Sequence, residues 1–413
     1  MDRQLVPWPV GPTDPAGLAA LAVAVRAAVD GSGPALAPVA DTPEARAALG
    51  TLPPRVPDAV ALVVRTSGST GGPRWVLLDR SALVASAEAT HERLGGPGRW
   101  LLALPPGHVA GLQVLVRSAL AGTDAVLVEP PGSPAALARA VEEARGGRRY
   151  AALVPTQLHR VVSQASTGAL PAALAALAQL DAVLVGGAAA PRPLLDAARA
   201  LGLRVVTTYG MTETCGGCVY DGVPLDGVRV AVHDGAVRIA GPVLARGYLP
   251  APEAGQDPFV VHDGVRWLRT ADAGELRDGR LTLLGRLDDV LVTGGVKVRP
   301  AAVEAALAAV PGVGEVCVVG VPDAEWGQEV TAVVVPARPL RHAQTAGDAV
   351  TLVQLREAAS RTLGSAAAPR RLVLVDALPQ RGPGKVDRSA VARIAAEGRT
   401  ARDGGQDHDG HSS

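Results

Sequence analysis

The sequence predicts an α/β protein, with a large N-terminal α/β domain built on a parallel sheet and a small α+β domain at the C-terminus. Three observations lead to this prediction. From Val60 onward, short valine- and leucine-rich runs alternate with alanine-rich helical patterns, which is typical of a parallel sheet covered by helices. Beyond Cys218 the expected strands are short and separated by Asp-Gly turns, which favours hairpins. From about Asp288, helical and strand patterns alternate again in a compact third region.

The expected elements of the first half follow in chain order. Residues 1–57 are rich in proline and alanine and contain one helical pattern, at 15–29. Apolar runs predict buried strands at 60–66, 99–104, 124–129, 150–155, 180–186 and 203–210. Helices are expected between several of these strands, at 80–94, 133–145 and 191–201. Because ligands bind beyond the carboxyl ends of strands in such sheets, we expect the site in the loops that follow these runs.

The second half predicts smaller elements. Hairpins at 228–241 and 274–285 are expected to form a small β-barrel-like part. The third region predicts helices at 300–309 and 351–363 and strands at 313–320, 328–336 and 371–376. The tail at 396–413 is polar and poor in aliphatic residues, which predicts disorder. We therefore expect domains at 1–287 and 288–395, followed by this tail.

Composition excludes several classes of protein. The chain has 413 residues and a formal net charge of +0, so it lacks the basic footprint of a nucleic-acid-binding protein. The apolar stretch at 17–25 is interrupted by Arg26 and is too short to span a bilayer, and the N-terminus lacks the order of a signal peptide. The 3 cysteines cannot build a disulfide framework. We expect a cytoplasmic protein with no integral membrane segment.

A hydroxyl- and glycine-rich loop, TSGSTGGPRWV at 66–76, directly follows a predicted strand. Its backbone amides can turn toward an anion, and Arg74 adds a fixed positive charge. The loop lacks the Gly-Lys-Ser/Thr of a Walker sequence, and an ordinary polar turn is the alternative interpretation. The density of small and hydroxyl residues favours a polyphosphate site. The residues concerned are Thr66, Ser67, Gly68, Ser69, Thr70, Gly71 and Arg74.

A second motif, TTYGMTET at 207–214, ends another predicted strand. Tyr209 offers a flat face for a base, and Thr212 offers a hydroxyl. Glu213 supplies a hard oxygen ligand that suits Mg²⁺. Upstream, the small residues around Gly187 let a planar ligand approach the backbone closely.

Two further motifs carry charge. Asp272 and Arg286 flank a predicted hairpin and can hold the two hydroxyls of a ribose, although a surface ion pair is the alternative. The 40 basic residues include only two lysines, Lys297 and Lys385, each in a glycine-rich stretch. Lysine is a slim, mobile point charge, whereas arginine is planar and bulky, so lysine in an arginine-rich chain suggests a requirement for its shape.

Taken together and in this order, the motifs from about Leu62 to Arg388 resemble the AMP-forming adenylating superfamily of acyl- and aryl-CoA ligases, adenylation domains and luciferases. The resemblance implies a mobile C-terminal α+β domain with a hinge at Asp288. It also implies ATP, Mg²⁺ and CoA as cofactors and a small carboxylic acid as substrate. The acid and ATP would form an acyl-adenylate, and a thiol would then displace AMP.

The resemblance also implies a role for each matching residue. The loop from Thr66 to Arg74 would hold the pyrophosphate. Gly187, Tyr209 and Thr212 would contact adenine and the α-phosphate, Glu213 would hold Mg²⁺, and Asp272 and Arg286 would hold the ribose. Lys385 would be the adenylation lysine, because a mobile cation can neutralise two approaching anions. Lys297 would lie near the thiol channel, unless it is a plain surface lysine.

Three segments carry the finer resemblance, which is to the o-succinylbenzoate–CoA ligases of menaquinone biosynthesis: 102–118, 153–160 and 209–228. It implies that His108 borders the acyl pocket, although a structural histidine is the alternative. Arg117 is a candidate partner for the second carboxylate of that acid. Another small aryl- or acyl-CoA ligase and a free-standing carrier-protein adenylation enzyme remain alternatives. The sequence does not fix the oligomeric state, and a homodimer stays open.

A zinc or redox interpretation of CGGC at 215–218 is also considered. Only Cys317 remains elsewhere in the chain, so four thiolate ligands cannot be assembled. Packing of these cysteines beside the nucleotide is favoured.

Overall fold

The computed structural model describes residues 2–11, 14–66, 74–166, 171–253, 255–337, 350–382 and 384–403. It contains two compact units. Unit 1 comprises Met1–Ala190, Leu194–Thr270 and Leu276–Thr282, and unit 2 comprises Pro191–Pro193, Ala271–Glu275 and Leu283–Ser413. The domain limits expected from the sequence stay a prediction.

Unit 1 begins with a six-stranded sheet in the order β15-β5-β4-β2-β1-β3. Its strands are β1 (Asp2–Val10), β2 (Ala35–Ala40), β3 (Arg55–Pro57), β4 (Val60–Arg65), β5 (Trp75–Asp79) and β15 (Gly247–Leu249). Helix α1 (Pro15–Asp30) connects the parallel strands β1 and β2, and α2 (Pro43–Leu49) follows β2. The Asp14 side chain caps α1 by accepting from the Gly17 amide at 2.9 Å, and Gly31 ends the helix with φ 90°.

A second sheet in unit 1 has seven strands in the order β12-β11-β10-β9-β8-β6-β7. They are β6 (Arg99–Leu102), β7 (Val126–Leu127), β8 (Arg149–Leu153), β9 (Ala182–Val185), β10 (Val205–Met211), β11 (Gly216–Tyr220) and β12 (Val223–Pro224). The strands from β7 to β10 are parallel, and β11 and β12 add antiparallel pairs. This arrangement confirms the expected parallel sheet.

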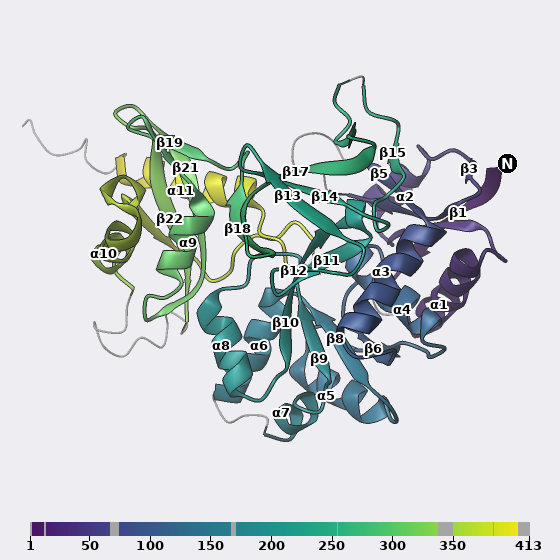
Figure 1. Cartoon of the computed structure of the whole chain (residues 1–413). Helices are drawn as coiled ribbons and strands as arrows, with labels where there is room; N and C mark the ends of the chain where they lie inside the picture. The colour runs from purple at the N-terminus through teal and green to yellow at the C-terminus, as the bar shows by residue number, and fades with distance from the viewer. Residues whose placement is uncertain are drawn as a thin grey trace, which may run out of the picture. The chain divides into compact units, whose positions relative to one another are not determined.

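Helices cover both faces of the seven-stranded sheet. They are α3 (Arg80–Arg93), α4 (Val109–Leu120), α5 (Pro134–Glu143), α6 (Pro155–Ser166), α7 (Pro171–Leu177) and α8 (Arg192–Ala200). Along β8, Tyr150 faces the core shared with α1, α3 and α4, whereas Ala151 faces the core shared with α5 to α8. Helices α1, α3 and α4 lie side by side and also cover the six-stranded sheet (Figure 1). The three helices are therefore packed between two sheets.

The β-barrel-like part expected from the sequence is a five-stranded sheet in the order β13-β14-β17-β16, with β18 paired to β17. Its strands are β13 (Arg229–His233), β14 (Ala236–Ala240), β16 (Phe259–His262), β17 (Val265–Arg277) and β18 (Arg280–Arg286). Asp234 and Asp278 each have a positive φ at the start of an Asp-Gly turn, as the two predicted hairpins require, and Asp263 has the same conformation in a hairpin between β16 and β17 that was not predicted.

Unit 2 is built on a sheet in the order β20-β19-β22-β21, with β23 paired to β22. Its elements are β19 (Leu291–Thr293), β20 (Val296–Val298), α9 (Pro300–Leu307), β21 (Val313–Asp323), β22 (Gly327–Pro336), α10 (Leu352–Leu363), β23 (Arg371–Leu374) and α11 (Arg388–Asp403). Helices α9 and α10 pack on one face of the sheet and α11 on the other (Figure 1). Val318 faces the first core and Cys317 the second, so adjacent residues of β21 serve opposite faces.

Two sequence predictions differ from the structure. The first 57 residues hold three strands and a second helix in addition to the expected α1. The tail predicted to be disordered from residue 396 differs at 396–403, where α11 continues to Asp403. Residues 404–413 lie outside the described part of the chain.

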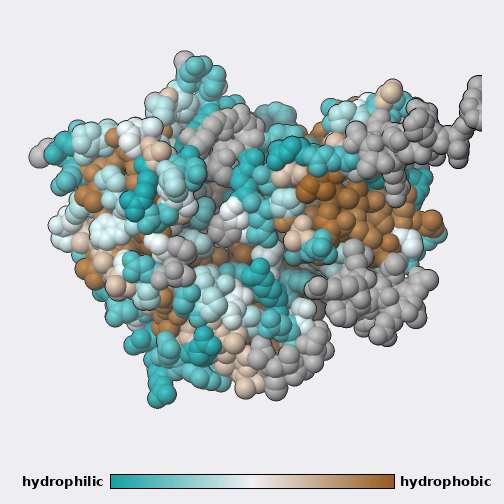
Figure 2. Space-filling view, turned by 180° about the vertical axis from the view of Figure 1, so that it is seen from behind, coloured by the Kyte–Doolittle hydropathy of each residue, from teal (hydrophilic) through white to brown (hydrophobic). Residues whose placement is uncertain are grey.

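On the face shown in Figure 2, polar side chains predominate and apolar ones gather in patches.

Candidate active site

The predicted phosphate loop joins two neighbouring strands of unit 1, β4 and β5. Arg65 pairs with Trp75, and the Thr66 amide donates to the Arg74 carbonyl at 2.8 Å. The Thr66 hydroxyl donates to the same carbonyl at 3.3 Å. The loop is therefore closed at its base by Thr66 and Arg74. Ser67, Gly68, Ser69, Thr70 and Gly71 lie outside the described residues, so their phosphate contacts stay a prediction.

The second motif ends in a single turn of 3-10 helix, η1 (Thr212–Thr214), between β10 and β11. The Glu213 carbonyl accepts from the Ala245 amide at 2.8 Å. The Glu213 carboxylate accepts from the Tyr248 hydroxyl at 2.9 Å, through Oε1. The Arg74 guanidinium lies over the same tyrosine ring, 5.6 Å from its centroid. The structure thus brings the end of the phosphate loop and the expected magnesium ligand to one aromatic side chain.

Buried hydrogen bonds hold the η1 turn in place. Cys215 adopts a left-handed conformation with φ 51°, which reverses the chain into β11. Its carbonyl accepts from Gln113 Nε2 at 2.7 Å and from Ser86 Oγ at 3.1 Å. The Thr214 hydroxyl accepts from the Met211 amide at 2.9 Å and donates to the Gly216 carbonyl at 2.7 Å. Helices α3 and α4 therefore fix the backbone that carries Thr212 and Glu213.

The expected adenine contacts follow neighbouring parallel strands. Val185 of β9 pairs with Thr207 of β10, so Gly187 follows one strand while Tyr209 lies near the end of the other. Gly187 has φ 82°, a backbone conformation that favours glycine. The Tyr209 ring is half-buried and packs against the main core of unit 1. These positions suit the close approach of a planar ligand that the sequence predicts.

The donor set fits a magnesium ion that is completed by substrate phosphates. Among the described residues, no group of three His, Cys, Asp or Glu side chains lies close enough to hold a metal by itself. Magnesium is usually bound by one or two carboxylates together with phosphate oxygens and waters. A ligating carboxylate is often oriented by a hydrogen bond to one of its oxygens, as Tyr248 orients Glu213. Glu213 is therefore the residue that would hold the ion.

The helix α4 carries two residues singled out in the sequence. His108 is the exposed N-cap residue of this helix. Arg117 is 3% exposed, and its guanidinium lies 4.9 Å from the Trp100 ring and 3.4 Å from the Tyr220 hydroxyl. Arg117 is therefore enclosed by core aromatics, and its expected contact with a second carboxylate stays a prediction.

His91 is buried beside the same tryptophan. Trp100 Nε1 donates to His91 Nε2 at 3.3 Å, which requires an unprotonated acceptor nitrogen. Burial, followed by the positive charge of Arg117, lowers the pKa of His91 to about 4. His91 is therefore neutral in the folded protein at physiological pH.

The expected ribose pair lies in unit 2. Arg286 Nη1 is 3.5 Å from Asp272 Oδ1, so the structure brings the two predicted residues together. Arg286 also donates to both oxygens of Asp288, at 2.7 and 2.5 Å. The hydrogen bond with Asp288 raises the pKa of Arg286. Asp288, the expected hinge residue, therefore accepts hydrogen bonds from the same guanidinium that is expected to bind the ribose.

Lys385 also belongs to unit 2, in a loop between β23 and α11. Its carbonyl accepts from the Arg381 amide at 2.7 Å, and Gln380 pairs with Val386 in an isolated bridge. The Lys385 side chain is exposed. The backbone therefore anchors the loop while the ammonium group is presented to solvent. Lys297 is likewise exposed, on β20.

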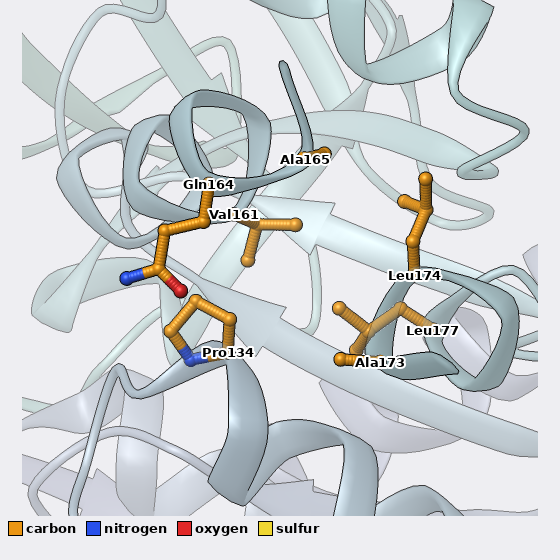
Figure 3. A pocket seen from close by; sticks show the side chains of 7 residues that line it. All are labelled: Pro134, Val161, Gln164, Ala165, Ala173, Leu174 and Leu177. Atoms are coloured by element: carbon orange, nitrogen blue, oxygen red, sulfur yellow. The ribbon is translucent and has the colours of Figure 1, made fainter. Parts of the chain in front are cut away.

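A small cavity in unit 1 lies away from these residues, among α5, α6 and α7 (Figure 3). Its volume is about 10 Å³, which is room for at most one water molecule. Its walls are apolar apart from Gln164. It is too small for a substrate or nucleotide.

The cysteines are buried free thiols. Burial raises the pKa of Cys215, and it raises the pKa of Cys218 and of Cys317 to about 12. Since the thiolate is the reactive and metal-binding form, neither redox chemistry nor zinc binding is favoured at CGGC. Within the described residues, no helix is long and apolar enough to cross a membrane.

The chain belongs to the AMP-binding enzyme family. It matches that family over residues 16–249 and the AMP-binding enzyme C-terminal domain over 302–385. It is 47% identical over 390 residues to the probable 2-succinylbenzoate–CoA ligase of Mycobacterium tuberculosis, over 92% of this chain and 96% of that relative. The superfamily resemblance and the fold class expected from the sequence are confirmed.

Solved structures agree with this assignment. The chain is similar to an Escherichia coli MenE variant with bound OSB-AMS, with a TM-score of 0.73 and 26% identity over 96% of this chain and 88% of that one. It is also similar to the o-succinylbenzoate coenzyme A synthetase (MenE) of Bacillus subtilis in complex with ATP and magnesium ion. That match has a TM-score of 0.66 and 28% identity over 80% of this chain and 69% of that one.

Tyr248 is the site residue that the motifs did not predict. It lies in the short segment ARGYLP, which has no hydroxyl or glycine cluster and no charged pair of its own. The sequence offers one signal for Tyr248, namely that it is a tyrosine on a short strand that follows the metal-ligand motif in the chain. Gln113 and Ser86 act through hydrogen bonds to the Cys215 carbonyl. These bonds join segments far apart in the chain, so the sequence does not predict them.

Proposed function

We propose that this protein is an ATP-dependent o-succinylbenzoate–CoA ligase that works through an acyl-adenylate. The observation that carries the proposal is the 47% identity, over nearly the whole of both chains, to the Mycobacterium tuberculosis relative. The Arg74–Tyr248–Glu213 arrangement supports the adenylating half-reaction, because it joins a phosphate loop to a carboxylate suited to Mg²⁺. The cofactors are ATP and Mg²⁺, and CoA is the thiol substrate.

The first half-reaction joins the acid to AMP. A carboxylate oxygen attacks the α-phosphorus of ATP, the bond to the β-phosphate oxygen breaks, and pyrophosphate leaves. Lys385 neutralises the approaching anions, while the loop from Thr66 to Arg74 holds the leaving pyrophosphate. Thr212 donates to the α-phosphate, and Asp272 and Arg286 hold the ribose. A magnesium ion on Glu213 would stabilise charge on the phosphates.

The second half-reaction transfers the acyl group. The sulfur of CoA attacks the acyl carbon, and AMP leaves as the acyl–oxygen bond breaks. His108, exposed at the start of α4, borders the acyl pocket and the thiol entrance in this proposal. Rotation of the C-terminal domain about Asp288 withdraws Lys385 between the half-reactions.

A panel of acids tests the proposal. ATP–pyrophosphate exchange is measured with o-succinylbenzoate, benzoate and a medium-chain fatty acid at equal Mg²⁺ and ATP. We expect kcat/KM for o-succinylbenzoate to exceed the others by at least ~10²-fold, because a site built for a second polar group rejects acids that lack it. CoA and a pantetheinyl carrier protein are then compared as acceptors. Strong exchange with benzoate or the fatty acid, or transfer to the carrier alone, contradicts the assignment.

Oligomeric state and location remain parts of the proposal. We propose a cytoplasmic enzyme, since the 3 cysteines are free and buried. A homodimer is to be tested by light scattering across a range of protein concentrations.

A further inference from the structure

Tyr248 occupies a defined position beside the phosphate loop. It lies on β15, which pairs antiparallel with β5, and its direct partner is Val76, two residues after Arg74. The side chain is 8% exposed. Its ring packs against Phe259, with the ring centroids 5.8 Å apart. The strand pairing and the ring packing together fix where the hydroxyl points.

The hydroxyl makes a specific bond to the expected metal ligand. It donates to Glu213 Oε1 at 2.9 Å, across a separation of 35 residues in sequence. Three residues before Tyr248, the Ala245 amide donates to the Glu213 carbonyl at 2.8 Å. The segment 245–248 therefore holds both the backbone and the side chain of Glu213.

The aromatic ring serves a second group. The guanidinium of Arg74 lies 5.6 Å from the ring centroid, within the range of a cation–π interaction. A tyrosine can hold a cation on its face and a carboxylate at its hydroxyl at the same time. Tyr248 thus contacts Arg74 at the end of the phosphate loop and Glu213, the acidic residue expected to hold the metal.

We propose that Tyr248 is a positioning residue that orients the Glu213 carboxylate for a nucleotide-bound divalent cation. The inference rests on the proposed adenylating function but does not depend on which acid is used. Hydrogen bonds to a ligating carboxylate fix its orientation, and their loss typically costs 10–100-fold in metal affinity. Phenylalanine at this position would keep the strand pairing and the packing on Phe259 while removing the bond to Glu213.

The test measures metal binding without turnover. Binding of Mn²⁺ to wild type and to Tyr248→Phe is followed by electron paramagnetic resonance, with saturating α,β-methylene ATP and no acid. We expect the Kd for Mn²⁺ to rise ~10–100-fold in the variant. In pyrophosphate exchange, the half-saturating Mg²⁺ concentration is expected to rise by the same factor, whereas the rate at saturating Mg²⁺ falls much less.

Tyr150→Phe is the matched control in unit 1. Tyr150 is also a buried tyrosine, and its hydroxyl donates to the Leu94 and Gly96 carbonyls at 3.1 and 2.9 Å. Its loss should affect stability but leave the Mn²⁺ affinity unchanged. Unchanged Mn²⁺ affinity in Tyr248→Phe, or an equal loss in Tyr150→Phe, overturns the proposal.

A double-mutant comparison tests whether Tyr248 acts through Glu213. Mn²⁺ affinity is measured in Glu213→Gln with and without Tyr248→Phe. If Tyr248 acts through Glu213, the second change has no further effect; a full additional loss contradicts the mechanism. Absence of Mn²⁺–nucleotide binding or of exchange with every acid in wild type would instead reject the proposed function itself.

Discussion

Replacing Lys385 with alanine should separate the two half-reactions. The lysine is exposed, and its loop is held by backbone contacts: Arg381 N–H to the Lys385 carbonyl at 2.7 Å and the Gln380–Val386 bridge. None of these contacts uses the ammonium group. We therefore expect the free energy of unfolding to change by no more than ~0.5 kcal/mol.

The catalytic loss should be far larger than the loss of stability. Removing one preorganised group that stabilises transition-state charge costs ~10²–10³ in rate, or ~3–4 kcal/mol. That loss should fall on adenylation, in which two anions approach each other. Transfer of a supplied o-succinylbenzoyl-adenylate to CoA should be nearly unchanged, because no anionic attack on phosphorus occurs in that step.

Two assays and one control decide the matter. Adenylation is measured by ATP–pyrophosphate exchange, and thioester formation from chemically prepared acyl-adenylate by chromatography of the CoA product. Lys297→Ala is the matched control, since this lysine is also exposed in unit 2 but lies on β20. An equal loss of both half-reactions in Lys385→Ala would refute the reasoning, as would an equal loss of adenylation in Lys297→Ala.

Two further changes test buried polar contacts of unit 1. The folded-state pKa of His91 lies near 4 and its ordinary value is 6.5, so stability is full above pH 6.5 and falls as pH drops toward 4. Between pH 7.5 and pH 5 this loss should reach up to about 2 kcal/mol in urea unfolding, and His91→Gln should remove most of that pH dependence. Gln113→Met deletes the donor to the Cys215 carbonyl and should cost about 1–3 kcal/mol, while AMP affinity measured by calorimetry should fall as well. An unchanged pH profile in His91→Gln, or unchanged unfolding in Gln113→Met, would contradict these assignments.

The central sheet of unit 1 could be predicted because its signals are local. The strand β9 and residues 150–153 of β8 are continuous buried runs, as expected for strands covered on both faces, and β10 begins with the apolar pair Val205 and Val206. Because parallel strands end at the same edge, Gly187 and Tyr209 could be placed near each other without knowledge of the packing.

The strands of the first 57 residues could not be predicted in this way, because β1 contains Pro7 and Pro9 and β2 contains Pro38. Because proline has no amide hydrogen to donate to a sheet, a run that contains proline is not predicted to be a central strand. In the structure, Pro7 and Pro9 lie on the part of β1 that pairs with β2, whereas pairing with β3 covers only Asp2 to Gln4. The missing amide hydrogens of Pro7 and Pro9 cost no hydrogen bond, because the edge of β1 that pairs with β3 has no partner strand at these two residues.

Tertiary contacts explain the remaining differences in the site. Tyr248 reaches Glu213 only because β15 pairs with β5, and Arg117 is enclosed only because α4 is packed between two sheets. Asp288 was expected to be a hinge, yet its carboxylate also holds Arg286. In each case the sequence identifies the residue type but not the partner, which the fold supplies.

The buried thiols have a practical consequence. Cys215 and Cys218 lie in the core of unit 1, and Cys317 lies in the core of unit 2. Because a shielded thiol with a raised pKa reacts with alkylating reagents only after its surroundings open, each cysteine reports local unfolding of its own unit. Mass spectrometry of labelled peptides can therefore compare how often the two units open, with and without nucleotide, in the natural chain and without any introduced probe.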